Sequence, residues 1–232
     1  MKNILCYGDS NTWGYIPGGK GRYEYAVRWT GAAQRLLGDG YRIIEEGLNG
    51  RTTVFDSPFD GSVLNGKSHL MCCLMSHAPL DAVVIMLGTN DLMHSHTAWE
   101  ASRGCIMLSR MVMNGALHFN AHTPRLLLVS PIHIGCEIAK TDQSPLSVSG
   151  YEESLKFAPL YEQAAARIGI DFLDAAKYAE PSPVDNEHMD AEGHAALAAA
   201  IADKLKTMLV EAGRDNKPFI LQQEERTPLN YA

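Results

Sequence analysis

The sequence lacks the features that mark membrane proteins and nucleic-acid-binding proteins. No apolar run approaches the roughly 20 residues that a membrane-spanning helix needs, and the opening MKNILCYGDS is too short for a signal-peptide core. Positive charge is also scarce, since 20 Lys and Arg against 27 Asp and Glu give a net charge of −7. We therefore expect neither nucleic acid nor a membrane as a partner, and a cytoplasmic location.

Cysteine is scarce as well. The five cysteines are an odd, scattered set without a C-x-x-C pair, which argues against a disulfide framework and a structural zinc site. We expect them to be buried thiols in a reducing cytoplasm. His94 and His96 have no third ligand at a convincing spacing, so we interpret them as surface histidines and expect no metal or other cofactor.

The composition, with 46% hydrophobic residues in 232, is typical of one globular α/β domain. Short runs rich in Ile, Val or Leu end in Gly, Ser, Pro or Asp, as buried parallel strands do. These runs span residues 3–7, 41–45, 82–87, 125–129 and 170–173. We assign residues 1–213 to the domain and interpret residues 214–232, a polar stretch with Pro218 and Pro228, as a tail or arm.

Helical spacing separates the apolar runs. The stripes are Trp29, Ala32, Ala33, Leu36 and Leu37; then Leu70, Cys73, Leu74 and His77; and finally Leu197, Ile201, Leu205 and Met208, before a stop at Gly213. Alternating strands and helices predict right-handed crossovers and a parallel sheet covered on both faces. Such sheets bind ligands beyond the carboxyl ends of their strands, so the functional residues are expected there.

Reactive side chains follow these strands. Ser10 ends the stretch LCYGDS, Gly50 and Asn90 follow the second and third runs, and Asp185 and His188 follow the fifth. A serine hydroxyl needs an adjacent base, which His188 provides if Asp185 holds its other ring nitrogen. The backbone N–H groups of Ser10 and Gly50 and the side-chain amide of Asn90 are then donors for an oxyanion. This pattern predicts a serine nucleophile with a catalytic triad.

The blocks Gly8-Asp9-Ser10, Gly50, GTND at 88–91 and Asp185-x-x-His188 resemble, in order, the four blocks of the SGNH, or GDSL-type, hydrolases. The stretches RWTG, EEGLNGRTT and PLDAVVIMLGTND are similar to the mycobacterial arylesterase/acyltransferase subgroup. The resemblance implies a three-layer α/β/α flavodoxin-like fold with a five-stranded parallel sheet. It also implies cytoplasmic homo-oligomers that hydrolyse short-acyl esters, with acyl transfer to alcohols in some members.

The chain departs from the family pattern at two positions. Asn11 stands where the family name has leucine, and Gly50 stands where the mycobacterial protein has a small residue other than glycine. The first change is expected to alter the local pocket, and the second keeps the backbone donor.

Several neighbouring residues have more than one interpretation. Trp13 and Tyr15 either wall the substrate pocket or pack in the core, and Ile132 and His133 are weaker candidates for the same cleft. A rival pair, Asp190 and His194, does not match the family spacing, and we interpret His194 as a solvated residue early in the last helix. Asp9 and Asp91 are expected to brace their loops.

The glycine-rich stretch from Gly14 to Lys20 begins like a phosphate-binding loop, but Gly21 stands where that loop needs Ser or Thr. We interpret it as an active-site loop. The sequence therefore predicts a metal-free carboxylic-ester hydrolase acting on short-acyl esters of aryl or small alkyl alcohols. A carbohydrate acetyl esterase, an acyltransferase and a non-catalytic binding module remain alternatives.

Overall fold

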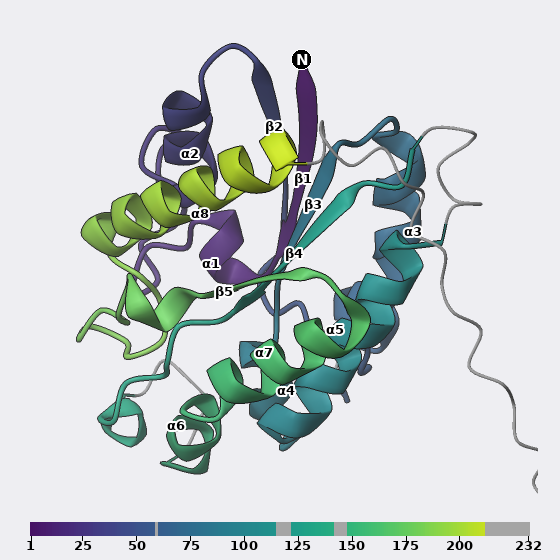
Figure 1. Ribbon diagram of the computed structural model, residues 1–232. Coiled ribbons are helices and arrows are strands. Elements are labelled where there is room, and N and C mark those ends of the chain that lie inside the picture. Colours follow the sequence, from purple (N-terminus) through teal and green to yellow (C-terminus); the bar gives the residue numbers. More distant parts are fainter. Residues whose placement is uncertain (59, 115–121, 142–147, 212–232) are drawn as a thin grey trace, which may run out of the picture.

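The computed structural model describes residues 1–58, 60–114, 122–141 and 148–211. Its centre is a parallel sheet in the order β2-β1-β3-β4-β5, with helices on both faces (Figure 1). The strands are β1 Lys2–Gly8, β2 Tyr41–Gly47, β3 Ala82–Met86, β4 Arg125–Ser130 and β5 Asp171–Asp174. The expected five-stranded parallel sheet is confirmed, with strand ends shifted by one or two residues.

Eight α-helices and three short 3-10 helices accompany the sheet in the described ranges. The α-helices are α1 Ser10–Trp13, α2 Trp29–Leu37, α3 Gly66–Ser76, α4 Thr89–Met93, α5 Ala98–Val112, α6 Val148–Ser154, α7 Phe157–Ile168 and α8 Ala191–Glu211. The 3-10 helices are η1 Ser62–Leu64, η3 Ile138–Lys140 and η4 Ala175–Lys177. None of the helices in these ranges is long and apolar enough to cross a membrane.

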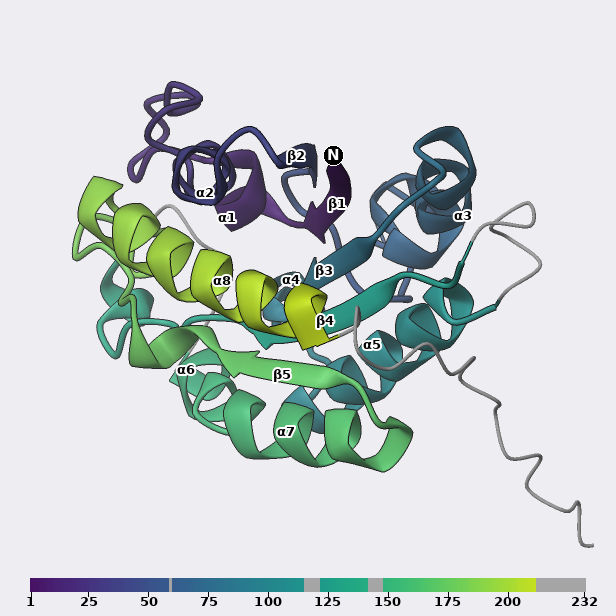
Figure 2. The same cartoon turned by 45° about the horizontal axis from the view of Figure 1, so that its top comes forward.

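Side-chain alternation along the strands builds a separate hydrophobic core on each face of the sheet. In β1, Ile4 and Cys6 pack with α2 and α8, whereas Leu5 and Tyr7 pack with α3, α5 and α7. Figure 2 shows the two groups of helices on opposite sides of the sheet. The result is the three-layer α/β/α arrangement expected from the alternating pattern.

The helical stripes are confirmed with local corrections. Leu36 is 50% exposed, because Trp29, Ala33 and Leu37 already fill the contact of this short helix with the core. His77 caps the end of α3 and bonds to Glu46 instead of joining the apolar stripe. The predicted stop at Gly213 and the predicted tail 214–232 lie outside the described residues.

The cysteines are all free, but the expectation that they are all buried is wrong. Cys6, Cys73 and Cys105 are buried, whereas Cys72 and Cys136 are exposed. Leu70 and Leu74 of α3 are spaced by four and share the buried side of the helix. Cys72 is two residues from each of them, so it lies on the opposite side, toward solvent.

The register of the sheet brings the sequence-predicted residues to one edge. Gly8 at the end of β1 pairs with Gly47 of β2 and with Met86 of β3, so the segments that follow these strands start at the same level. The residue after Gly8 begins the turn that carries Ser10, and Asn90 lies in α4 just beyond β3. The carboxyl edge of the sheet therefore holds the candidate site.

Candidate active site

Ser10 is the first residue of the short helix α1, directly after the turn at the end of β1. The side chain of Asp9 accepts a hydrogen bond from the backbone N–H of Asn11 at 3.0 Å, which caps this helix. Ser10 Oγ lies 2.9 Å from Nε2 of His188, within hydrogen-bond distance. The structure thus joins a serine and a histidine that are 178 positions apart in the sequence.

Asp185 holds the opposite side of the histidine ring. Its Oδ2 lies 2.9 Å from His188 Nδ1, while its Oδ1 accepts the backbone N–H groups of Glu187 and His188 at 3.1 and 3.0 Å. One carboxylate therefore shapes the turn and orients the imidazole. A further N–H, that of Gly18 in the glycine-rich loop, donates to Asp185 Oδ2 at 3.2 Å.

The pKa values of His188 and Asp185 shift in the directions expected for a hydrogen-bonded pair of an imidazole and a carboxylate. Burial alone disfavours the imidazolium, but the hydrogen bond to Asp185 and the carboxylates of Glu187, Asp185 and Asp9 outweigh it and raise the pKa of His188. Burial works in the same way against the Asp185 carboxylate, yet its hydrogen bonds from His188 lower the pKa of Asp185. An ionised aspartate beside a basic imidazole is the arrangement that proton transfer from a serine requires.

Asn11 fixes the backbone on both sides of the histidine. Its Oδ1 accepts the N–H of Met189 at 3.0 Å, and its Nδ2 donates to the carbonyl of Glu187 at 3.4 Å. The residue that departs from the leucine of the family name thus joins the serine turn to the histidine segment. Sequence reasoning expected a change of pocket here and missed this bridging role.

The predicted oxyanion donors lie on three neighbouring segments. In the described part of the chain, the backbone N–H groups of Ser10 and Gly50 donate no hydrogen bond, so both are available to a ligand. Asn90 Nδ2 donates to the carbonyl of Arg51 at 3.2 Å, which places the Asn90 amide beside the Gly50 turn. Gly50 has φ +76°, a left-handed conformation that glycine adopts without strain.

Arg51 and Asp91 hydrogen-bond to the segments that carry the predicted donors and stabilise them. Arg51 donates to the carbonyls of Gly8 and Glu46, and its guanidinium lies 4.0 Å from the centre of the Tyr7 ring. Asp91 accepts the N–H of Thr53 at 3.0 Å and the hydroxyl of the same residue. Asp9 caps α1 and Asp91 bonds to Thr53, so the expectation that both aspartates brace their loops is confirmed.

Comparison with known proteins agrees with this geometry. A model of the GDSL-like lipase/acylhydrolase family matches residues 6–196. The chain belongs to this family. It is accordingly a carboxylic-ester hydrolase, as the sequence predicted.

Solved structures place this hydrolase near esterases of two kinds. It is 37% identical to a carbohydrate acetylesterase from Sinorhizobium meliloti, with a TM-score of 0.81 and coverage of 90% of this chain and 100% of that one. An aryl esterase from M. smegmatis is 34% identical, with a TM-score of 0.81 over 89% of this chain and 99% of that one. A further crystal structure is 46% identical, with a TM-score of 0.85 over 90% and 99% of the two chains. No curated protein matches the chain in sequence.

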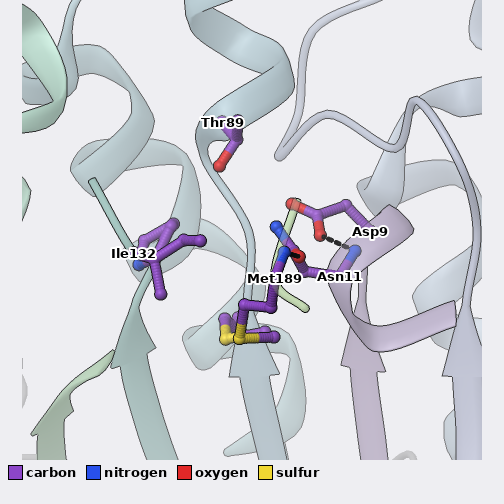
Figure 3. A pocket seen from close by; sticks show the side chains of 7 residues that line it. Asp9, Asn11, Thr89, Ile132 and Met189 are labelled. Atoms are coloured by element: carbon purple, nitrogen blue, oxygen red, sulfur yellow. Dashed lines mark hydrogen bonds between the residues drawn. The ribbon is translucent and has the colours of Figure 1, made fainter. Parts of the chain in front are cut away.

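The four predicted substrate-binding residues of this hydrolase have different surroundings in the structure. Tyr15 lies against His188, with ring centroids 4.3 Å apart, and Trp13 follows at 6.4 Å from Tyr15. Ile132 is buried and lines a small pocket with Asp9, Asn11, Thr89 and Met189, between the ends of the strands (Figure 3). His133 is partly exposed after β4, and its role stays a prediction.

The interpretation of His194 as a solvated residue is wrong. It is fully buried, and its Nδ1 accepts the backbone N–H of Trp29 at 3.2 Å, at the start of α2. Burial lowers the pKa of His194 to about 4, so the ring is neutral at physiological pH. The rival histidine of this hydrolase therefore caps a helix, a role that sequence spacing does not reveal.

Two buried aspartates close to the site, Asp9 and Asp91, have raised pKa values. Burial raises the pKa of Asp9 to about 7, against the lowering effect of its hydrogen bond from Asn11. The pKa of Asp91 is also about 7, because burial outweighs its two hydrogen bonds from Thr53. Asp9 bonds within its own turn and Asp91 bonds to Thr53 of the segment after β2, and in the described residues neither has a hydrogen bond to the hydroxyl of Ser10.

Proposed function

We propose that this protein hydrolyses short-acyl esters, acetyl esters above all, of aryl or small alkyl alcohols through an acyl-enzyme on Ser10. The observation that carries the proposal is the continuous hydrogen-bonded chain from Ser10 Oγ through His188 to Asp185, with contacts of 2.9 Å at both steps. A serine so placed has the base that it needs to attack a carbonyl at neutral pH. The similarity to an aryl esterase supports the substrate class.

The reaction follows from this geometry in two halves. Ser10 Oγ attacks the ester carbonyl while its proton passes to His188 Nε2, and the ionised Asp185 stabilises the imidazolium that forms. His188 then returns the proton to the leaving alcohol, and the acyl group remains on Ser10. Water, deprotonated by the same nitrogen, releases the acid and restores the serine.

The negative oxygen of each tetrahedral intermediate would lie against the N–H groups of Ser10 and Gly50 and the amide of Asn90. Fixed donors of this kind stabilise a transition state by about 3–4 kcal/mol each. The Asn90 amide has two hydrogens, and its bond to Arg51 uses one of them. The second hydrogen is the one that we assign to the oxyanion.

Trp13 and Tyr15 are the proposed wall of the alcohol or acyl pocket, because Tyr15 contacts His188 and Trp13 lies beside it. Flat aromatic walls favour aryl and small alkyl groups over long flexible chains. If the same wall holds an alcohol in place of water, the acyl-enzyme transfers its acyl group to that alcohol. Acyl transfer is thus a second outcome of the same intermediate.

The first test is p-nitrophenyl acetate turnover by the wild type, Ser10→Ala and Ser68→Ala. Ser68 is exposed on α3 and serves as the matched control. We expect Ser10→Ala alone to lose turnover, by about 10⁴-fold or more. Full activity of Ser10→Ala would contradict the mechanism. Failure of the folded wild type to react with a fluorophosphonate would instead favour a non-catalytic binding module.

A carbohydrate acetyl ester is the second candidate substrate, favoured by the 37% identical carbohydrate acetylesterase. Acetate release from acetylated xylan and from simple sugar acetates, compared with phenyl acetate, distinguishes the two classes. Adding benzyl alcohol to the phenyl acetate reaction measures transfer, because benzyl acetate forms only if the alcohol captures the acyl group.

Two further properties belong to this proposal. We place the protein in the cytoplasm, and the free state of all five cysteines supports a reducing compartment. We also propose a homo-oligomer, which light scattering after size exclusion tests against the 25.4 kDa of one chain.

A further inference from the structure

A second group of reactive side chains lies on the face of the sheet covered by α3. Glu46 is the penultimate residue of the edge strand β2, and its alternation partner Ile44 packs in the same core as Cys73 of α3. His69 and Cys73 belong to α3, and His77 caps the end of that helix. Since these three residues are spaced by four, they lie along one side of the helix, toward Glu46.

Three of the four side chains converge on one point, and His77 bonds to Glu46 beside them. The ligand atoms of Glu46, His69 and Cys73 all lie within 4.8 Å of one another. His69 Nε2 is 4.0 Å from Glu46 Oε2, and His77 Nε2 is 2.8 Å from Glu46 Oε1. An ordinary surface ion pair needs one histidine and one carboxylate. Here a second histidine and a buried thiol face the same carboxylate.

We propose that Glu46, His69 and Cys73 form a binding site for a zinc ion, with His77 holding the Glu46 carboxylate from outside the metal shell. An imidazole nitrogen, a thiolate and a carboxylate are ligand types that zinc accepts, and a water molecule completes its tetrahedral shell. Hard cations such as magnesium and calcium prefer oxygen ligands alone, so this donor set disfavours them. The site is distinct from the Ser10 site, whose triad is complete without it.

The distances fit the ion after small movements. With metal–ligand bonds of about 2.0–2.3 Å, the ligand atoms of a tetrahedral site lie roughly 3.3–3.7 Å apart. The separation of 4.0 Å between Glu46 Oε2 and His69 Nε2 must therefore shorten slightly, whereas the 2.8 Å contact between Glu46 Oε1 and His77 Nε2 stays as a hydrogen bond outside the metal shell. The side chain of His69 is 52% exposed and is free to make that movement.

Charge and protons balance in this site. Burial, followed by the field of Glu46, raises the pKa of Cys73 to about 12, so the metal-free side chain is a thiol. When the zinc–sulfur bond forms, the S–H bond breaks and its proton passes to the solvent. The thiolate and the carboxylate then neutralise the two charges of the ion. The nearby cation Arg51 is held by two backbone carbonyls and by the Tyr7 ring.

Bound zinc would tie the edge strand β2 to α3. Such a link stabilises the folded state, since a preformed site binds the ion and the unfolded chain does not. It would also hold the start of the loop that leads from Glu46 to the Gly50 turn. The link is structural, and the reaction on Ser10 needs no step through it.

The experiment uses cobalt(II) as a spectroscopic substitute for zinc on the purified full-length chain, after treatment with a chelator. We expect one cobalt ion per chain, with the visible bands of a tetrahedral site and a thiolate-to-cobalt charge-transfer band in the near ultraviolet. Zinc should displace the cobalt and raise the melting temperature. The absence of stoichiometric binding would overturn the proposal.

Variants show which residues hold the ion. Cys73→Ser should lose the charge-transfer band, and His69→Gln should weaken cobalt binding roughly tenfold or more. The controls are Cys72→Ser, which removes the exposed neighbouring thiol, and His122→Gln, which removes an exposed histidine that pairs with Asp81 instead. Both should bind as the wild type does. A band lost in Cys72→Ser but kept in Cys73→Ser would contradict the assignment.

Cobalt binding by two further variants decides the cases that Cys73→Ser leaves open. If circular dichroism shows that Cys73→Ser is unfolded, the exposed His69→Gln variant decides the question, because unchanged cobalt binding there overturns the site. Ser10→Ala should bind cobalt as the wild type does, which separates this proposal from that of the ester hydrolase.

Discussion

Tyr15 lies against the imidazole of His188, with ring centroids 4.3 Å apart and an angle of 33° between the planes. The tyrosine comes from the loop after α1, and the histidine from the segment before α8. This contact covers the face of the ring whose edges bond to Ser10 and Asp185. Tyr15 therefore limits both the rotation of His188 and the access of water to it.

Removing this ring should slow catalysis more than removing its hydroxyl. We expect Tyr15→Ala to lower kcat for p-nitrophenyl acetate about tenfold, because a freer imidazole spends less time aligned with Ser10. Tyr15→Phe keeps the ring and should stay close to the wild type. Steady-state kinetics of the two variants provide the check, and equal loss in both would show that the hydroxyl matters instead.

Asp185→Asn should cost about 10⁴-fold in kcat while the turn persists. The asparagine keeps Oδ1, which accepts the two backbone N–H groups, but its amide turns a donor toward His188 Nδ1. The ring then carries its proton on Nε2, where it cannot accept the proton of Ser10. Asp190→Asn is the matched control and should retain activity, since among the described residues the Asp190 side chain bonds to the start of α8 and not to His188. Comparable losses in both would point to the rival pair.

The acidic limb of the pH profile should follow His188. Its pKa is raised, so the imidazole becomes protonated, and useless as a base, at a higher pH than an ordinary histidine. Glu187 contributes to that rise by its charge. In Glu187→Gln the limb of kcat/KM should therefore move to lower pH, and activity should persist in more acidic buffer. A limb that moves to higher pH, or stays in place, would contradict the assignment.

Asn11→Leu restores the leucine of the family name and should destabilise this chain. Leucine cannot accept the N–H of Met189, which is then buried without a partner at a cost of about 1–3 kcal/mol. Urea denaturation should show the loss as a lower midpoint with an unchanged slope. A midpoint equal to that of the wild type would mean that the two segments hold together without this side chain.

His194 should weaken the fold in acid. The folded pKa of about 4 lies below the ordinary 6.5, so the unfolded chain takes up the proton first and stability falls as pH drops through this range. The loss amounts to about 2 kcal/mol between pH 7 and pH 5. Asp9 and Asp91 act in the opposite direction, because their raised pKa values favour the folded state on acidification.

A comparison of wild type with His194→Asn isolates this effect, because both proteins contain the two aspartates. Asparagine retains an acceptor for the Trp29 N–H but does not titrate. The difference in unfolding free energy between the two proteins should therefore change with pH in favour of the variant below pH 6. Parallel curves for the two proteins would refute the role of His194.

The sheet and the site edge were predictable because they depend on local patterns. Continuous apolar runs identify buried parallel strands, and the order of such strands in βα units places their ends together. Ser10, Asp185 and His188 were recognisable because the base and its orienting acid lie three residues apart on one turn. Their mutual contacts agree with that reasoning, and their catalytic roles remain a prediction.

The contacts missed from sequence all join distant segments through groups that have no characteristic spacing. Asn11 bonds to the backbone beside His188, Gly18 to Asp185, and His194 to the first N–H of α2. A backbone partner leaves no mark in the sequence. The spacing of His69, Cys73 and His77 was visible, but their fourth partner, Glu46, comes from a strand and is found only in the fold.

The contact between Ser10 and His188 also sets when the protein acquires activity. The two residues are 178 positions apart in a chain of 232, so their contact closes a long loop. During synthesis the serine turn emerges first, yet it has no base until the segment before α8 has left the ribosome and docked. A partly made or partly refolded chain therefore carries an inert serine, and esterase turnover reports the complete fold where helix content alone does not.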